Sequence, residues 1–256
     1  MIYNDICPYC GVPLEKSENM PNSRAVEHLI ANAAITIARK NDEGDFYSCR
    51  KCNSKKSHVD RLLGKIGKIQ SADERLAAET LIGAITSDSK SSKRFIDMAT
   101  RAQEYINHVE LDVPIDAEEL IEYIKFLGKG QYFKEHRTPL DNDKYVMRIQ
   151  YINKDRCMYI EERYRCEHNS SPFRDLERND HSELINNGEC IIYSKNNFYL
   201  FFFHDYTAIM INVLENTEEN RKLAYKSEEY IIKHFNFSHN NELHGIVRNC
   251  RVPYKL

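Results

Sequence analysis

The sequence predicts an α+β protein, in which a small N-terminal module with metal-ligating cysteines precedes a helical region and an antiparallel sheet with a packed helix. Three observations support this prediction: two CxxC pairs within the first 52 residues, helical spacing of apolar residues from residue 59, and short segments rich in β-branched and aromatic residues after residue 139. A chain of 256 residues with 41% hydrophobic and 29% charged residues can bury a core. We therefore expect segments at 1–68, 69–138 and 139–256.

The middle segment is expected to contain three helices. Ser71 followed by Glu74 forms a capping-box pattern, which favours the start of a helix. A second helix is predicted over 92–109, because its apolar residues recur on one face. A third is predicted over 116–128, from another capping-box pattern to a glycine stop signal.

The C-terminal segment has the pattern of an antiparallel meander. Tight hairpin connections are expected at KNN and HDY, where turn-forming residues separate two apolar runs. A helix is predicted over 217–235, followed by a short strand near GIVRNC. The strands expected before that helix are KYVMRIQY, CMYIEERY, ECIIYSK, NFYLFFFH and TAIMINV.

Four of the eight cysteines have the spacing of a zinc site. They form C-x2-C, a gap of 38 residues and a second C-x2-C, and two such turns can direct all four sulfurs at one tetrahedral ion. The ligands predicted for this structural zinc are Cys7, Cys10, Cys49 and Cys52. The spacing of Cys157, Cys166 and Cys190 is not that of a metal site, so we expect buried thiols there.

A glutamate and a histidine lie between the two CxxC pairs, and an asparagine follows the second pair directly. The order CPYC, VEHLI, CRKCNSKKS across about residues 5–65 resembles the zinc-ribbon form of the HNH, or ββα-metal, endonuclease family. The resemblance implies that His28 is the general base, and that Glu27 and Asn53 bind a catalytic Mg²⁺ or Mn²⁺. Such a hard cation stabilises the negative charge that develops when a phosphodiester is hydrolysed.

The sequence departs from the family pattern at two positions. Glu27 stands where the family usually has aspartate or histidine. The middle asparagine of the family is replaced by Gly44 and Asp45, and Asn41 or Asn32 could substitute for it. For His58, five residues after Asn53, an approach to the metal and a surface position on a helix both remain open.

Positive charge is concentrated in one stretch of an otherwise acidic chain. The net charge is −3, yet residues 49–68 contain seven lysines and arginines and one acidic residue. This stretch could bind phosphates or form a solvated helix face. A second basic stretch, 125–137, could contact nucleic acid or form an exposed loop. The residues predicted to contact nucleic acid are Arg50, Lys51, Lys55 and Lys56.

These observations favour a DNA endonuclease whose C-terminal segment supplies targeting or regulation. The resemblance implies a role in restriction or antiphage defence. Two alternatives stay open: a zinc ribbon that binds nucleic acid without cutting it, and an effector gated when the C-terminal segment binds a small molecule or a protein. A homodimer is also left open. With no signal-peptide pattern and no long apolar run, we expect a cytoplasmic protein without membrane contact.

Overall fold

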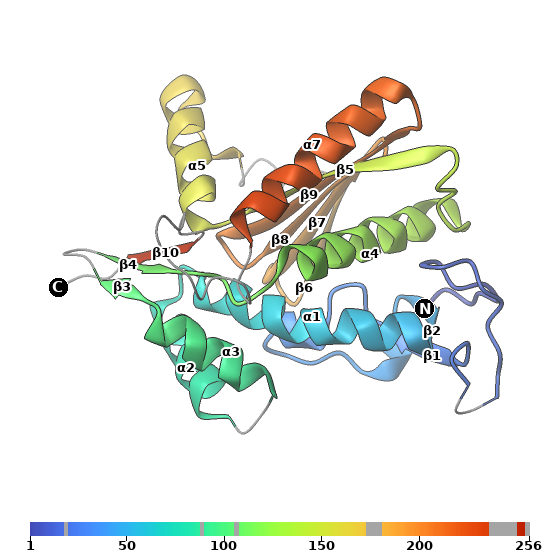
Figure 1. Ribbon diagram of the computed structural model, residues 1–256, viewed down its shortest axis with the longest axis horizontal. Coiled ribbons are helices and arrows are strands. Elements are labelled where there is room, and N and C mark those ends of the chain that lie inside the picture. Colours follow the sequence, from blue (N-terminus) through green and yellow to red (C-terminus); the bar gives the residue numbers. More distant parts are fainter. Residues whose placement is uncertain (18–19, 88–89, 105–107, 173–180, 236–249, 254–256) are drawn as a thin grey trace.

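The computed structural model describes residues 1–17, 20–87, 90–104, 108–172, 181–235 and 250–253. Over these residues the chain is α+β, as predicted, with an N-terminal strand–strand–helix unit and a C-terminal antiparallel sheet covered by helices (Figure 1). A further small sheet has the order β10-β4-β3.

The N-terminal unit is an antiparallel hairpin followed by a long helix. Strand β1 (Arg24–Glu27) pairs with β2 (Phe46–Cys49), and Glu27 lies opposite Phe46. Helix α1 (Arg50–Ile69) begins directly after β2, and the Cys49 sulfur caps it by accepting the Cys52 N–H. The loop between the strands contains two short 3₁₀ helices, η1 (Asn32–Ala34) and η2 (Asn41–Glu43).

The first two helices of the middle segment are shorter than predicted. Asp73 caps α2 by accepting the N–H groups of Arg75 and Leu76, so the predicted start at Ser71 is wrong by two residues. The helix predicted over 92–109 ends at Thr100, because the chain then enters two strands. These elements are α2 (Glu74–Thr86), α3 (Lys90–Thr100), β3 (Gln103–Glu104) and β4 (His108–Leu111).

Helix α4 (Ala117–His136) begins as predicted, with Asp116 and Glu119 forming a capping box. It does not stop at Gly128. The glycines allow close packing there: a Cβ on Gly128 would lie 2.9 Å from the Met147 sulfur. Tertiary packing therefore overrides the helix-breaking tendency of glycine. Residues 125–136 of the second basic stretch belong to this helix, so of the two interpretations left open for the stretch the exposed loop is wrong.

The C-terminal sheet has the strand order β5-β9-β8-β7-β6, and every neighbouring pair is antiparallel. Both tight hairpins are confirmed by left-handed turn residues, with φ of 50° at Asn196, 61° at Asn197 and 54° at His204. The strands are β5 (Tyr145–Ile152), β6 (Ser182–Ile185), β7 (Cys190–Lys195), β8 (Phe198–Phe203) and β9 (Thr207–Glu215).

One predicted strand is a helix. The segment CMYIEERY lies within α5 (Lys154–His168), which Asn153 caps by accepting the Arg156 N–H. Ion pairs four residues apart, including Arg163–Glu167 at 3.2 Å, stabilise helix rather than strand. The helix predicted at 217–235 is confirmed as α7 (Glu218–His234), and a last short strand, β10 (Cys250–Pro253), follows the undescribed residues 236–249.

A single cluster of buried residues runs from the N-terminal unit to the end of α7, from Leu29 through Ile66 and Leu127 to Ile231. Helix α4 lies between α1 and the sheet (Figure 1). A smaller cluster covers the opposite face of the sheet, where Leu200 and Phe202 pack near Cys157 of α5. Within the described residues, no helix has the length and apolar character needed to cross a membrane.

Candidate functional site

The four predicted zinc ligands come together at the N-terminus of α1. The sulfurs of Cys7, Cys10, Cys49 and Cys52 all lie within 4.8 Å of one another, and the Cys10 and Cys49 sulfurs are 3.7 Å apart. Zinc–sulfur bonds of about 2.3 Å place tetrahedral ligands about 3.8 Å apart. The four thiols could therefore bind a structural metal such as zinc.

The thiols of the cluster differ in acidity. A hydrogen bond from the Cys52 thiol, together with backbone N–H groups, lowers the pKa of Cys7 to about 5 although burial opposes this. Cys52 is the donor of this hydrogen bond, so the bond raises the pKa of Cys52, and burial raises it further. The Cys49 N–H also donates to the Cys7 sulfur, at 3.3 Å. The site thus stabilises one thiolate readily, and a cation would stabilise the others.

The hairpin and α1 bring Glu27 and Asn53 into contact. The Asn53 Nδ2 donates to the Glu27 Oε2 at 3.0 Å, and Ser48 donates to the same oxygen at 3.1 Å. Asn53 Nδ2 also lies 3.2 Å from the Val26 carbonyl. Residues 26 positions apart in the sequence are adjacent because α1 begins where β2 ends and packs against the hairpin.

Lys56 lies beneath this pair, with none of its side chain exposed. Its ammonium lies 3.0 Å from a Glu27 carboxylate oxygen and 3.0 Å from Asp60, and it donates to the His28 carbonyl at 3.2 Å. Burial disfavours the charged ammonium, but the two carboxylates outweigh it and raise the pKa of Lys56. Burial raises the pKa of Asp60 to about 6.

This geometry corrects one predicted nucleic-acid contact. Arg50, Lys51 and Lys55 are exposed on the first turns of α1, but Lys56 is not, because two acidic side chains hold it inside the molecule. Further along α1, Lys68 donates to the Ile35 carbonyl. The basic stretch is therefore not one continuous positive face.

His28 follows Glu27 and is half-buried. Both of its ring nitrogens are buried, and neither has a hydrogen-bond partner among the residues that the structure describes. Burial, and after it the charge of Arg39, lowers the pKa of His28, so its neutral form is favoured. A neutral imidazole with an unengaged nitrogen can accept a proton.

Asp45 holds the main chain next to His28. Its Oδ2 accepts the Leu29 N–H at 2.8 Å, and its Oδ1 lies 3.0 Å from the Lys134 ammonium on α4. Burial disfavours the charge of Asp45, but Lys134, the Leu29 N–H and Arg39 together lower its pKa. Asp45 is one of the two residues found where the family pattern has its middle asparagine.

The two asparagines considered as substitutes lie elsewhere in the loop. Asn32 binds both main-chain groups of Arg39, each at 2.9 Å. Asn41 is exposed in η2. His58 is an exposed residue of α1, 3.5 Å from Glu119. Of the other cysteines, Cys157 and Cys190 are buried as predicted, but Cys166 is exposed, because the segment that contains it is a surface helix.

Asp60 and Asp45 were missed as site residues by the sequence analysis. The four-residue spacing of Lys56 and Asp60 is typical of a helical ion pair, and this signal could have revealed Asp60. The contact of Lys134 with Asp45 joins residues 89 positions apart, and no local pattern predicts it.

Comparisons of this chain with protein-family models, curated proteins and solved structures found no match.

Proposed function

We propose that the protein is a metal-dependent endonuclease that hydrolyses phosphodiester bonds of DNA. The observation that carries this proposal is the meeting of Glu27 and Asn53, 3.0 Å apart, beside a histidine whose ring nitrogens are both unengaged. A cysteine cluster able to hold a structural metal anchors the same helix terminus. This combination supplies a base, oxygen ligands and a rigid support.

Glu27 and Asn53 would hold the catalytic Mg²⁺ or Mn²⁺, because a carboxylate and an amide oxygen suit hard cations. Bound there, the ion would stabilise negative charge on the phosphate and on the leaving oxygen. The Ser48 hydroxyl and the Lys56 ammonium fix the orientation of the Glu27 carboxylate. The structural zinc would be a separate ion.

His28 acts as the base in this proposal. Its neutral ring takes a proton from a water molecule, whose oxygen forms a bond to phosphorus while the bond from phosphorus to the leaving oxygen breaks. The leaving oxygen is protonated from solvent. Lys56 donates to the His28 carbonyl and Asp45 accepts the Leu29 N–H, so both polar groups of the peptide bond that follows His28 are held in place.

A plasmid assay tests the proposal. Wild-type protein and His28→Ala are incubated with supercoiled DNA, with and without Mg²⁺ or Mn²⁺, and the products are separated on a gel. We expect nicking or linearisation only with wild type and metal. The zinc content and the melting temperature of the variant should match those of wild type, since His28 is not a cysteine-site ligand. Metal-dependent cleavage by His28→Ala would contradict its role as the base.

One observation favours a second candidate, a zinc ribbon that binds nucleic acid without cutting it. The Lys56 ammonium already lies 3.0 Å from Glu27, so a positive charge occupies one side of the carboxylate that would hold the catalytic ion. In that case, nucleic-acid binding would be independent of Mg²⁺ and of His28, and neither wild type nor His28→Ala would cut the plasmid.

The biological setting of the proposed nuclease is restriction or antiphage defence in the cytoplasm. The C-terminal sheet would supply targeting, or would gate the nuclease when it binds a protein or a small-molecule activator. Zinc content, cleavage and oligomeric state can each be measured on the same purified protein.

A further inference from the structure

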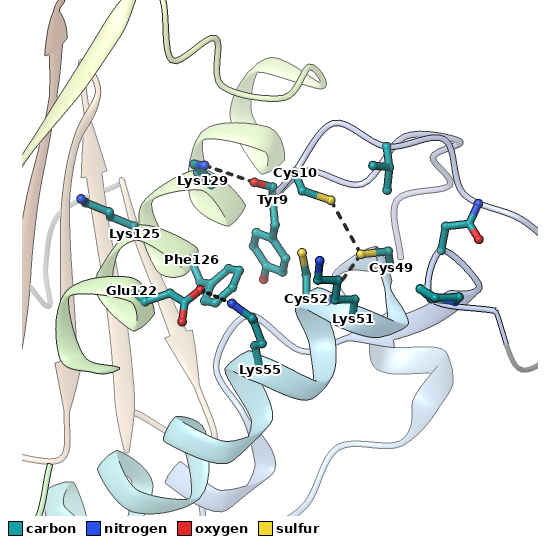
Figure 2. A pocket seen from close by; sticks show the side chains of 13 residues that line it. Tyr9, Cys10, Cys49, Lys51, Cys52, Lys55, Glu122, Lys125, Phe126 and Lys129 are labelled. Atoms are coloured by element: carbon teal, nitrogen blue, oxygen red, sulfur yellow. Dashed lines mark hydrogen bonds and ion pairs between the residues drawn. The ribbon is translucent and has the colours of Figure 1, made fainter. Parts of the chain in front are cut away.

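Two cavities on the surface of α4 share part of their wall. The first, of about 600 Å³, lies between the cysteine cluster, α1 and α4, and Figure 2 shows its lining. The second, of about 540 Å³, lies between α4, β5 and α7. Lys125 and Lys129 line both, so the two cavities are neighbours along α4, and we call them together the α4 groove. It connects the N-terminal unit with the C-terminal sheet.

The charged side chains of the α4 groove are mostly cationic. Five basic residues line it, against two carboxylates, Glu122 and Glu228. In Figure 2, Lys55 on α1 lies beside Glu122 on α4, and Lys51 lies next to the cysteine cluster. A groove with this balance of charge complements a polyanion. Its basic residues are Lys51, Lys55, Lys125, Lys129 and Arg221.

Two of these lysines are paired with acidic groups, but only at the surface. Lys55 lies 3.0 Å from Glu122 with 54% of its side chain exposed, and Lys125 lies 2.7 Å from Glu228 with 40% exposed. Ion pairs between exposed side chains contribute little to stability, so a phosphate can replace the carboxylate at low cost. Lys129 has a structural role as well, because it donates to the Tyr9 carbonyl at 3.1 Å.

The walls between the charges are apolar and aromatic. Tyr9 and Phe126 form the apolar floor of the first cavity, but they are buried and pack edge-on against each other, so neither ring has a face open to a base. Tyr225, with 65% of its surface exposed, lines the second. A positive groove with an exposed aromatic ring is a combination that binds single strands, since a base can stack on the Tyr225 ring while phosphates follow the cations. Duplex bases, already stacked and paired, cannot use such walls.

We propose that the α4 groove binds a single-stranded segment of the polynucleotide, with its phosphates along the lysines and a base stacked on Tyr225. This rests on the proposed function, because it assigns the path of that nuclease's substrate. Lys51 and Lys55 lie on the side of α1 opposite Asn53, given 3.6 residues per turn. The groove therefore lies on the side of α1 away from Asn53, so the test measures binding in the groove separately from cleavage.

The test measures binding apart from cleavage. His28→Ala protein is titrated, without divalent metal, into a labelled single strand of about 16 nucleotides, its RNA equivalent and a duplex of the same sequence. The groove variant carries Lys51→Glu and Lys125→Glu. The control variant carries Lys93→Glu and Lys195→Glu, which make the same charge change at exposed positions outside both cavities. Melting temperature and zinc content verify that both variants fold.

We expect the single strand to bind more tightly than the duplex. The affinities of the DNA strand and of its RNA equivalent show which of the two polynucleotides the protein prefers. The groove variant should weaken single-strand binding by on the order of tenfold and reduce the slope of log affinity against log salt by about 1.4, at about 0.7 per lost phosphate contact. The control should change both much less. The proposal would be overturned if both folded variants lost the same affinity for the single strand, or if the groove variant bound it as tightly as the parent protein. It would also be overturned if the duplex bound as tightly as the single strand. If the groove variant weakens binding but wild type does not cleave the plasmid, the proposed nuclease activity is contradicted, and the proposed binding of a single strand in the groove still stands.

Discussion

At the level of single residues, the ammonium of Lys56 joins two carboxylates and a main-chain carbonyl inside the molecule. It connects Glu27 on β1, Asp60 on α1 and the carbonyl of His28. The sequence alone favours an exposed lysine here, because its neighbours in the chain are cationic. Only the packing of the hairpin against α1 turns this lysine inward, so of its contacts only the one with Asp60, four residues on, follows from local pattern.

Replacing Lys56 with methionine should destabilise the fold strongly. The variant leaves Glu27 and Asp60 buried without their cation, and breaking a buried ion pair from one side costs about 3–5 kcal/mol. The control is Lys55→Met, whose ion pair with Glu122 is exposed and contributes little to stability. Denaturant unfolding gives both free energies of unfolding. A similar small loss in the two variants would show that the buried network contributes little.

At the level of secondary structure, α1 supports the loop that follows His28. The Gly64 main chain is close to that loop: a Cβ at Gly64 would lie 2.6 Å from the Ala33 carbonyl carbon and 2.8 Å from the Ala34 nitrogen. Both atoms belong to η1, so neither can move like the end of a flexible side chain. A glycine is therefore required here for the approach of two backbones.

Gly64→Ala should lower the free energy of unfolding by about 1–3 kcal/mol, because the added methyl group forces α1 away from η1. Gly83→Ala on α2 is the matched control. Nothing lies within 4 Å of a Cβ there, and the better helix propensity of alanine should stabilise the protein by up to about 1 kcal/mol. We expect Gly64→Ala to lower the melting temperature and Gly83→Ala to raise it. A higher melting temperature for Gly64→Ala would refute the close approach of α1 to η1.

The accuracy of the sequence-based predictions varied among the elements for physical reasons. Hairpins at Asn196 and His204, and the cap at Asp116, are encoded by neighbouring residues, and they were predicted correctly. The extension of α4 beyond Gly128 depends on Met147, a partner distant in sequence. In α5, the aromatic residues suggested a strand, whereas the charge spacing and the Asn153 cap determine a helix. The spacing of the four cysteines was sufficient to predict their cluster.

At the level of the whole molecule, the cysteine cluster is continuous with the packing around α4. Tyr9, between Cys7 and Cys10, packs edge-on against Phe126, and Phe46 packs in the same way against Phe133. These residues form one buried cluster with Cys7, Cys49 and Cys52. Loss of the ordered cysteine turn would therefore also remove apolar cover from α4.

Removal of zinc should lower the stability of the entire protein. Structural zinc contributes about 10–16 kcal/mol of binding free energy in zinc-finger peptides, which is more than the usual stability of a domain. We expect a chelator to lower the melting temperature, zinc to restore it, and Cys10→Ser to reduce the bound zinc. Cys166→Ser, at an exposed cysteine outside the cluster, is the control. Melting unaffected by chelation and by Cys10→Ser would exclude a stabilising metal.

Helix α4 also restricts how this protein can have exchanged parts with others during evolution. Gly130 approaches Leu29 and Phe46 of the N-terminal unit, and Gly128 approaches Met147 and Ile211 of the sheet. A recombination event that joined either half to an unrelated chain would bring an unmatched surface against this helix. The N-terminal unit could therefore be exchanged with its packing intact only together with α4.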